Sequence, residues 1–269
     1  MTKTRILACL VIVFAVSVST IRAQQSADPR VADIVRAGKL RVGLGVGSPV
    51  LALKDATTGE IRGPALDLAR ALAKKIGVEV APVEYPRPGA VLAGLKNNEW
   101  DFTFLVADPA RQADADFSPP YMQSDFTYLV HASSTKRSVT DLDQQGVRIA
   151  VPRGDASDLR LTQILKHAEL VRLDSIGAAI EMVHTAKVDA YAAPRVVLLS
   201  LSDKAPGSRV LDDGFANISW VAMVPKGKVD HIAYVSDFLE EAKASGLIKH
   251  TIDQAKLRGL QVAPAGKVN

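Results

Sequence analysis

The sequence predicts an α/β protein of two lobes, each built on a mainly parallel sheet flanked by helices and joined to the other by two extended crossings. Strand-like and helix-like stretches alternate from residue 38 to residue 106, a pattern typical of parallel sheets. The alternation restarts near residue 147, and extended runs precede and follow this second unit. With 269 residues, 48% of them hydrophobic, the chain is long enough for two cores.

The N-terminal segment has the pattern of a signal peptide. Lys3 and Arg5 provide a positive start, residues 6–20 are uncharged and mostly apolar, and Ile21-Arg22-Ala23 resembles a small-residue cleavage site. We therefore expect export to the periplasm, with cleavage near Ala23. The alternative is a lipid anchor at Cys9, but in that pattern the apolar run precedes the cysteine, whereas here it follows.

Composition excludes several classes of function. Cys9 is the only cysteine, so the mature chain would have no thiol for disulfides or thiol chemistry. The formal charge of +4 includes Lys3, Arg5 and Arg22, whose removal leaves +1 and no nucleic-acid footprint. No histidine has a partner at metal-ligand spacing, so we expect neither a metal nor a cofactor; the histidines are His131, His167, His184, His231 and His250.

The first unit reads as alternating helices and strands that end at glycines. Gly38 and Gly77 each follow a helical pattern as a stop signal. The sequence GLGVG at residues 43–47 lacks the GxGxxG spacing and helix start of a dinucleotide site. The predicted helices are Arg30–Ala37, Pro64–Ile76 and Gly89–Asn97, and the predicted strands are Leu40–Val46, Val78–Val83 and Phe102–Val106.

Parallel strands place their carboxyl ends at one edge of the sheet, where ligands gather. Ser48, Pro88 and the turn Asp108–Arg111 all follow strands or precede helices at that edge. The planar fork of donors on Arg111 suits a carboxylate. The alternative for Arg111 is an ordinary surface ion pair with a nearby aspartate, for which Asp108, Asp114 and Asp116 are available.

The second unit contains a turn, Arg153–Asp158, between a strand and a helix. The free N–H groups of a helix start favour an anion, but Asp155 or Ser157 could instead cap its own helix. The remaining predictions are the strands Val147–Val151, Leu170–Leu173 and Val188–Ala193, the helices Leu159–Leu165, Ser175–Ala186 and Asp230–Ser245, and the extended crossings Gln123–His131 and Ile218–Val224.

Short motifs in a fixed order give the chain a family resemblance from about Gly38 to Ile252. The motifs are Gly38-Lys39-Leu40-Arg41-Val42-Gly43, Gly63 with Leu66-Asp67-Leu68-Ala69 and Ala71-Leu72-Ala73, Leu95 with Asp101, Pro109-Ala110-Arg111, Asp116-Phe117-Ser118-Pro119-Pro120-Tyr121, and Val188-Asp189-Ala190. With these motifs the chain resembles the extracellular solute-binding proteins of family 3, the periplasmic receptors of polar amino-acid ABC importers, which have the type II periplasmic binding protein fold.

The resemblance implies a site and a motion. Arg111 would bind the carboxylate of the solute, helped by the helix start formed by Gly154, Asp155, Ala156 and Ser157. The lobes, residues 24–127 with 222–269 and residues 128–221, would close by bending at the two crossings. The implied partner is a separate ABC permease in the inner membrane, and we expect the receptor to be a monomer.

Three departures from the family pattern bear on the ligand. Pro194, followed by Arg195, occupies the position where an aspartate usually holds the ammonium group. Gly47–Val50 replaces an aromatic run, and Phe104–Ala107 replaces hydroxyl residues. We therefore expect a pocket poor in aromatic walls and hydroxyls, and a carboxylate-bearing ligand without the usual ammonium clamp. Asp108 or Asp155 could replace the missing acid, which keeps amino acids among the candidates. The predicted site residues are Arg111, Asp108, Ser48, Phe104, Gly154, Asp155, Ala156, Ser157 and Arg195.

The expected function is a periplasmic receptor and not an enzyme. One alternative is a cyclohexadienyl dehydratase on the same scaffold, in which Arg111 holds the substrate and Glu84 or His184 moves protons. Another is a receptor that reports to a membrane signalling protein. The sequence leaves open whether the solute is an amino acid or an organic acid.

Overall fold

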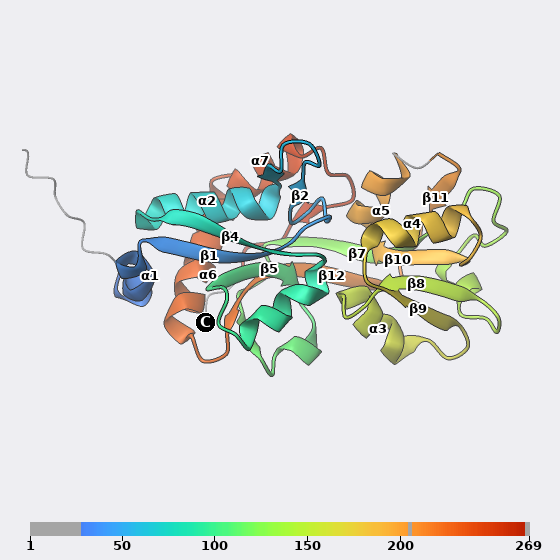
Figure 1. Cartoon of the computed structure of the whole chain (residues 1–269), viewed down its shortest axis with the longest axis horizontal. Helices are drawn as coiled ribbons and strands as arrows, with labels where there is room; N and C mark the ends of the chain where they lie inside the picture. The colour runs from blue at the N-terminus through green and yellow to red at the C-terminus, as the bar shows by residue number, and fades with distance from the viewer. Residues whose placement is uncertain (1–27, 204–205, 267–269) are drawn as a thin grey trace, which may run out of the picture.

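The computed structural model describes residues 28–203 and 206–266, so the predicted signal peptide and Cys9 lie outside it. Two lobes lie side by side along the long axis of the molecule (Figure 1). Lobe 1 contains the first described residues and the C-terminal helices, and lobe 2 contains the middle of the chain. This confirms the predicted two-lobe α/β fold.

Lobe 1 is built around the parallel strands β4 (Glu79–Tyr85), β1 (Lys39–Gly45) and β5 (Phe102–Val106). Helix α2 covers one face and α6 the other (Figure 1). The helices are α1 (Ala32–Ala37), α2 (Pro64–Ile76), α6 (Val229–Ala244), α7 (Leu247–Gln254) and the 3-10 turns η1 (Pro29–Val31), η2 (Pro88–Leu95) and η3 (Pro109–Arg111); the further strands are β2 (Leu53–Lys54), β3 (Ile61–Arg62) and β6 (Ala115–Phe117).

Lobe 2 repeats this plan with the parallel strands β10, β8 and β9. Helices α4 and α5 lie on one side of these strands and α3 on the other (Figure 1). The elements are η4 (Val139–Leu142), β8 (Arg148–Pro152), α3 (Ala156–Ile164), β9 (Glu169–Leu173), α4 (Ile176–His184), β10 (Ala190–Pro194), α5 (Arg195–Ser202) and β11 (Ser208–Val210).

Two long strands cross between the lobes. β7 (Met122–His131) and β12 (Ala216–Pro225) pair antiparallel from Met122–Trp220 to Phe126–Ala216. β12 also pairs with β5 of lobe 1, and β7 pairs with β10 of lobe 2, so hydrogen bonds join both lobes into one sheet. The predicted lobe boundaries, at 127/128 and 221/222, fall within these strands. A third, short strand at the same place, β13 (Gln261–Val262), pairs with β7 and was not predicted.

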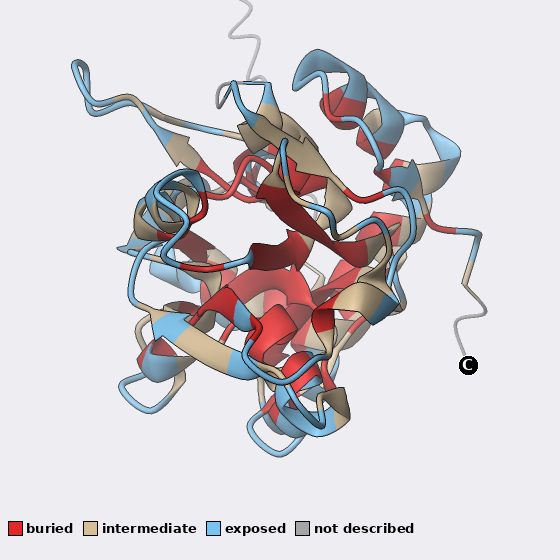
Figure 2. Cartoon of the chain, turned by 90° about the vertical axis from the view of Figure 1, so that its right-hand side faces the viewer, coloured by how far each residue is buried: buried red, intermediate tan, exposed pale blue. Residues whose placement is uncertain are grey.

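The strands form the buried centre of the molecule, surrounded by exposed loops (Figure 2). All five residues of β5 are buried, as expected for a central strand of a parallel sheet. A separate small cluster in lobe 2 packs around Tyr128, Ile149 and Leu161. No helix of the described residues has the length and hydropathy to cross a membrane.

The helical predictions need correction in three places. The stretch predicted as helix Gly89–Asn97 is the 3-10 segment η2, which contains two glycines and is held closely, because a Cβ on Gly94 would overlap the ring of Tyr85. Helix α7, which follows α6, was not predicted, and neither was helix α5. Helix α5 begins directly after Pro194, which ends β10 and takes the N-cap position.

Candidate functional site

An inter-lobe cavity of about 50 Å³ lies where the carboxyl ends of the lobe 1 strands face the start of α3. Charged and hydroxyl side chains provide its polar part, and most of the wall is apolar. The lining residues are Ser48, Leu51, Pro88, Leu105, Val106, Arg111, Phe126, Pro152, Asp155, Ala156, Ser157, Tyr191, Ala193, Pro194, Val197 and Trp220.

Arg111 lines this cavity as a buried cation that forms no salt bridge with any of the described residues. Only 3% of the residue is exposed, and its Nε has no hydrogen-bond partner. Nη1 donates to the carbonyl of Val106 at 2.9 Å, and Nη2 donates to the carbonyl of Gly154 at 3.4 Å. Burial lowers the pKa of Arg111, and the fields of Asp155 and Asp108 oppose that shift. This geometry excludes the surface ion pair that was the alternative.

Asp155 faces Arg111 from lobe 2 and is likewise buried. It holds the N-cap position of α3, but its side chain makes no capping hydrogen bond. Instead Oδ1 accepts the backbone N–H of Gly89 in lobe 1 at 2.5 Å. Burial raises the pKa of Asp155 to about 6, although the Gly89 hydrogen bond and Arg111 act in the opposite direction. The alternative prediction, that the Asp155 side chain caps its own helix, is therefore wrong.

The two lobes contact each other over the mouth of this cavity. Arg87 donates a hydrogen bond to the carbonyl of Arg153, next to the Gly89–Asp155 and Arg111–Gly154 contacts. Gly89 and Gly154 approach so closely that a Cβ on Gly89 would lie 2.7 Å from the carbonyl oxygen of Gly154. The structure is therefore closed around the cavity.

The structure brings together five of the nine predicted site residues: Ser48, Arg111, Asp155, Ala156 and Ser157. Gly154 lies directly beside them and contributes its carbonyl to Arg111.

Three predicted site residues lie outside the cavity lining. Asp108 caps η3 by accepting the N–H of Ala110 at 2.8 Å. Phe104 packs edge-on against Tyr121 in the core. Arg195 forms an ion pair with Asp125 on β7, at 2.6 Å, and donates to the carbonyls of Leu211 and Asp212.

The expected scarcity of aromatic walls is wrong. Phe126 on β7, Tyr191 on β10 and Trp220 on β12 all line the cavity. They come from the crossings and from lobe 2, whereas the expectation concerned the loop Gly47–Val50 after β1. Their positions in strand-like runs predicted that these side chains are buried. Those runs did not predict whether the side chains point into the cavity or into the core.

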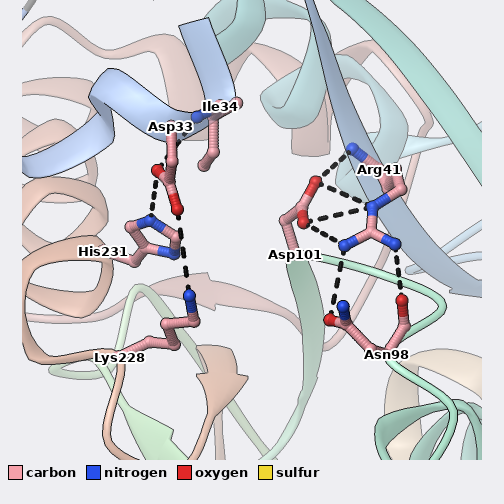
Figure 3. A network of polar contacts seen from close by, with 7 residues as sticks. All are labelled: Asp33, Ile34, Arg41, Asn98, Asp101, Lys228 and His231. Atoms are coloured by element: carbon pink, nitrogen blue, oxygen red, sulfur yellow. Dashed lines mark hydrogen bonds and ion pairs between the residues drawn. The ribbon is translucent and has the colours of Figure 1, made fainter. Parts of the chain in front are cut away.

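A second polar region lies at the opposite end of the lobe 1 strands (Figure 3). There Asp101 accepts hydrogen bonds from the Arg41 backbone N–H and from its Nε and Nη2 atoms, with a shortest distance of 2.6 Å. Arg41 Nη1 also donates to the carbonyl of Asn98 at 2.5 Å. Beside them His231 Nε2 lies 2.8 Å from Asp33 Oδ1. The hydrogen bond to Asp101 raises the pKa of Arg41.

Among residues 28–203 and 206–266, no group of three or more histidine, cysteine, aspartate or glutamate side chains could hold a metal ion. The lining residues with polar side-chain atoms are Arg111, Asp155, Ser48, Ser157, Tyr191 and Trp220. Such a set suits a small organic solute with one anionic group.

Comparisons with known proteins agree with this geometry. The chain is 26% identical over 187 residues to the glutamine-binding protein of Geobacillus stearothermophilus, covering 68% of this chain and 71% of that protein. Its structure matches the solute receptor for L-cysteine of Neisseria gonorrhoeae with a TM-score of 0.79, at 20% identity, over 87% of this chain and 99% of the other.

It also matches the ancestral amino acid-binding protein AncCDT-1, a precursor of cyclohexadienyl dehydratase, with a TM-score of 0.74 and 26% identity, over 83% and 98% of the two chains. The family profile of the bacterial extracellular solute-binding proteins, family 3, matches residues 40–255, most of the chain. The chain therefore belongs to the bacterial extracellular solute-binding proteins, family 3.

Proposed function

We propose that this protein is the periplasmic receptor of an ABC importer and that it captures a small carboxylate-bearing solute, an amino acid or an organic acid, between its lobes. The single observation that carries the proposal is the state of Arg111. It is buried at the cavity, its Nε is unpartnered, and no carboxylate of the described residues pairs with it. A buried cation is strongly destabilising unless an anion joins it, and the solute would provide that anion.

The surroundings of Arg111 support capture by closure. Lobe 1 contributes the guanidinium, and lobe 2 contributes the start of α3 with Ser157. A carboxylate between them would contact both lobes and so stabilise the closed arrangement. The curated relatives named for glutamine binding are consistent with import of a small zwitterion or acid. We propose that a separate inner-membrane permease receives the solute from a monomeric receptor.

The test is a thermal unfolding screen of the mature chain, from residue 24 onward, against single amino acids, monocarboxylates and dicarboxylates. A solute at 100 times its Kd adds about 2.7 kcal/mol of stability and raises Tm. Arg111→Ala should abolish the shift given by the best solute. Arg70→Ala is the matched control, because Arg70 lies on the surface of α2 with 54% of its side chain exposed. Equal shifts in wild type and Arg111→Ala would place the anion anchor elsewhere and overturn the proposal.

A second candidate function is a dehydratase of the cyclohexadienyl class. Asp155 favours it, since a buried carboxyl whose pKa is about 6 can donate a proton to a leaving hydroxyl beside a carboxylate anchor. The proton carriers expected from the sequence do not support it: Glu84 is paired with Lys54 on the surface, and His184 is exposed on α4. Incubation with prephenate or arogenate, followed by detection of the aromatic product and carbon dioxide, decides the matter. The absence of product removes this candidate.

A further inference from the structure

The turn at residues 153–155, between β8 and α3, provides the lobe 2 side of the contact between the lobes. Each of its three residues accepts one hydrogen bond from lobe 1, through the carbonyls of Arg153 and Gly154 and the carboxylate of Asp155. The donors in lobe 1 are the Arg87 and Arg111 side chains and the Gly89 backbone N–H. The lobes can therefore make this contact only while the turn keeps its conformation.

Asp158 holds this turn from within lobe 2. It is the third residue of α3, and only 5% of it is exposed. Its Oδ2 accepts the Gly154 backbone N–H at 2.8 Å, and its Oδ1 accepts a hydrogen bond from Arg172 Nε on β9 at 2.9 Å. The Thr162 hydroxyl donates to the same Oδ1 at 3.3 Å. Both oxygens of the carboxylate are therefore used inside lobe 2, and Asp158 joins the turn, the helix and the neighbouring strand.

Two aspartates at the start of α3 have different tasks. An N-cap carboxylate ordinarily accepts a backbone N–H of the first helical turn, but Asp155 accepts the Gly89 N–H of lobe 1 instead. Asp158 reaches back across the helix start, as the acid of a capping box does, and accepts the N–H of Gly154. Gly154 has a φ of +70°, in the left-handed region that favours glycine. The hydrogen bond to Asp158 thus fixes the residue whose backbone directs Asp155 away from its own helix.

We propose that Asp158 is a positioning residue for lobe closure, which acts through Gly154 and Asp155. Its hydrogen bonds all lie within lobe 2, and it is not one of the cavity-lining residues. Its carboxylate holds the turn so that Asp155 meets Gly89, and Arg172 neutralises that carboxylate. This inference rests on the proposed function, because closure around a solute is the step that the contact would serve.

A purely structural role for Asp158 predicts a different outcome. A carboxylate in the first turn of a helix stabilises that helix through its dipole, so its removal would then loosen lobe 2 and leave lobe 1 unaffected. Two neighbouring amides of lobe 1 separate the two roles. The Gly89 N–H donates to Asp155 in lobe 2, whereas the Ala90 N–H donates to the carbonyl of Arg87 in its own lobe, at 3.1 Å. Of the two, Gly89 alone reports on the contact between the lobes.

The test is amide hydrogen exchange, followed by NMR on the chain from residue 24 onward without solute, because all of these contacts join atoms of the chain. Asp158→Ala should speed exchange at Gly89 about tenfold, the effect of losing one hydrogen bond to a charged group, and leave Ala90 unchanged. Asp155→Ala removes the acceptor itself and sets the upper limit of that acceleration. Asp158→Asn keeps an acceptor oxygen for the Gly154 N–H and should restore slow exchange.

The matched control is Asp143→Ala, because Asp143 holds the turn at the other end of α3. Its carboxylate accepts hydrogen bonds from the backbone N–H groups of Lys166, His167 and Ala168 at 2.8–3.1 Å, all within lobe 2. Urea denaturation should show a similar loss of stability in Asp143→Ala and Asp158→Ala, whereas exchange at Gly89 should change only in the second variant.

Exchange at Gly89 that is equally fast in Asp143→Ala and Asp158→Ala, or unchanged in Asp158→Ala, would overturn this inference and leave Asp158 as a stabiliser of α3. The same holds if Asp158→Asn exchanges as fast as Asp158→Ala, or if the Gly89 N–H is unprotected in wild type. None of these outcomes bears on the proposed function, which fails only if no solute requires Arg111 for binding.

Discussion

Arg41 and Arg111 lie at opposite ends of the paired strands β1 and β5 and meet opposite surroundings. Arg41 has 29% of its side chain exposed, and Asp101 and Asn98 accept hydrogen bonds from it (Figure 3). Arg111 is 3% exposed, yet within the part of the chain that the structure describes no carboxylate forms a salt bridge with it and its Nε has no acceptor. The hydrogen bond to Asp101 raises the pKa of Arg41, whereas burial lowers the pKa of Arg111.

The difference separates an arginine that stabilises the fold from one that is available to a ligand. At the amino ends of the strands, the chain provides both charges of the pair, and the interaction is complete in the folded protein. At the carboxyl ends, Arg111 is buried and no described carboxylate lies within salt-bridge distance of it, which destabilises the unliganded closed state. That deficit is what a bound anion would remove.

The largest expected effect comes from replacing each arginine with methionine. Arg41→Met should lower the free energy of unfolding by about 2–3 kcal/mol, because it removes charge-assisted hydrogen bonds to Asp101. Arg111→Met should leave the unliganded protein as stable as wild type or more stable, because a buried unpaired charge is replaced by an apolar side chain of similar length. Urea denaturation of the unliganded proteins measures both. Equal losses of unfolding free energy in the two variants would contradict the idea that Arg41 stabilises the unliganded fold and Arg111 does not.

The next largest effect concerns the close contact between Gly89 of lobe 1 and Gly154 of lobe 2, which lies beside Arg111. Gly89→Ala should weaken solute binding about tenfold, since its Cβ would overlap the backbone of Gly154 and hinder closure. Gly177→Ala on α4 is the matched control, because its Cβ would meet no atom within 4 Å. Titration of the same solute into both variants is the measurement. Unchanged affinity in Gly89→Ala would mean that closure does not use this contact.

The smallest effect is the pH dependence that Asp155 adds to stability. The folded pKa, about 6, lies above the ordinary value of 3.8. Between these values the folded state holds a proton that the unfolded state has released, so this stabilisation is present at low pH and is lost as pH rises through 6. Wild type should therefore gain about 1 kcal/mol relative to Asp155→Asn between pH 7 and pH 5. Chemical denaturation at the two values tests this, and a gain of the opposite sign would contradict the raised pKa.

Much of the fold could be predicted because the pattern of each element agrees with its role in the sheet. The apolar residues at helical spacing before Gly77 gave Pro64–Ile76 with the observed bounds, and the β-prone run before Asp108 gave Phe102–Val106. Both segments are bounded by residues that stop regular structure, which limits the alternatives. The short C-terminal strand β13 carries no such pattern, because two residues are too few to show a period.

The site was predictable where one residue follows a strand directly, as Arg111 does, but not where side chains converge from distant segments. Trp220 and Phe126 reach the cavity through the register of β7 and β12, which no local pattern specifies. Arg195 follows Pro194 in the sequence and was expected at the cavity for that reason. The start of α5 instead directs it to Asp125, an ion pair that depends on the position of β7.

The third strand at the crossing restricts where the molecule can bend. At Met122 and Gln123, β7 is hydrogen-bonded on one edge to β12 and on the other to β13. From Phe126 onward it is paired with β10 of lobe 2. Ser124 and Asp125 lie between these two stretches and are paired on one edge only, with Ile218 and Asn217 of β12, and Asp125 is also held by Arg195. We therefore expect a rotation of one lobe against the other to bend β7 at this pair of residues, and a spin label or fluorophore placed beside them would report the angle of opening.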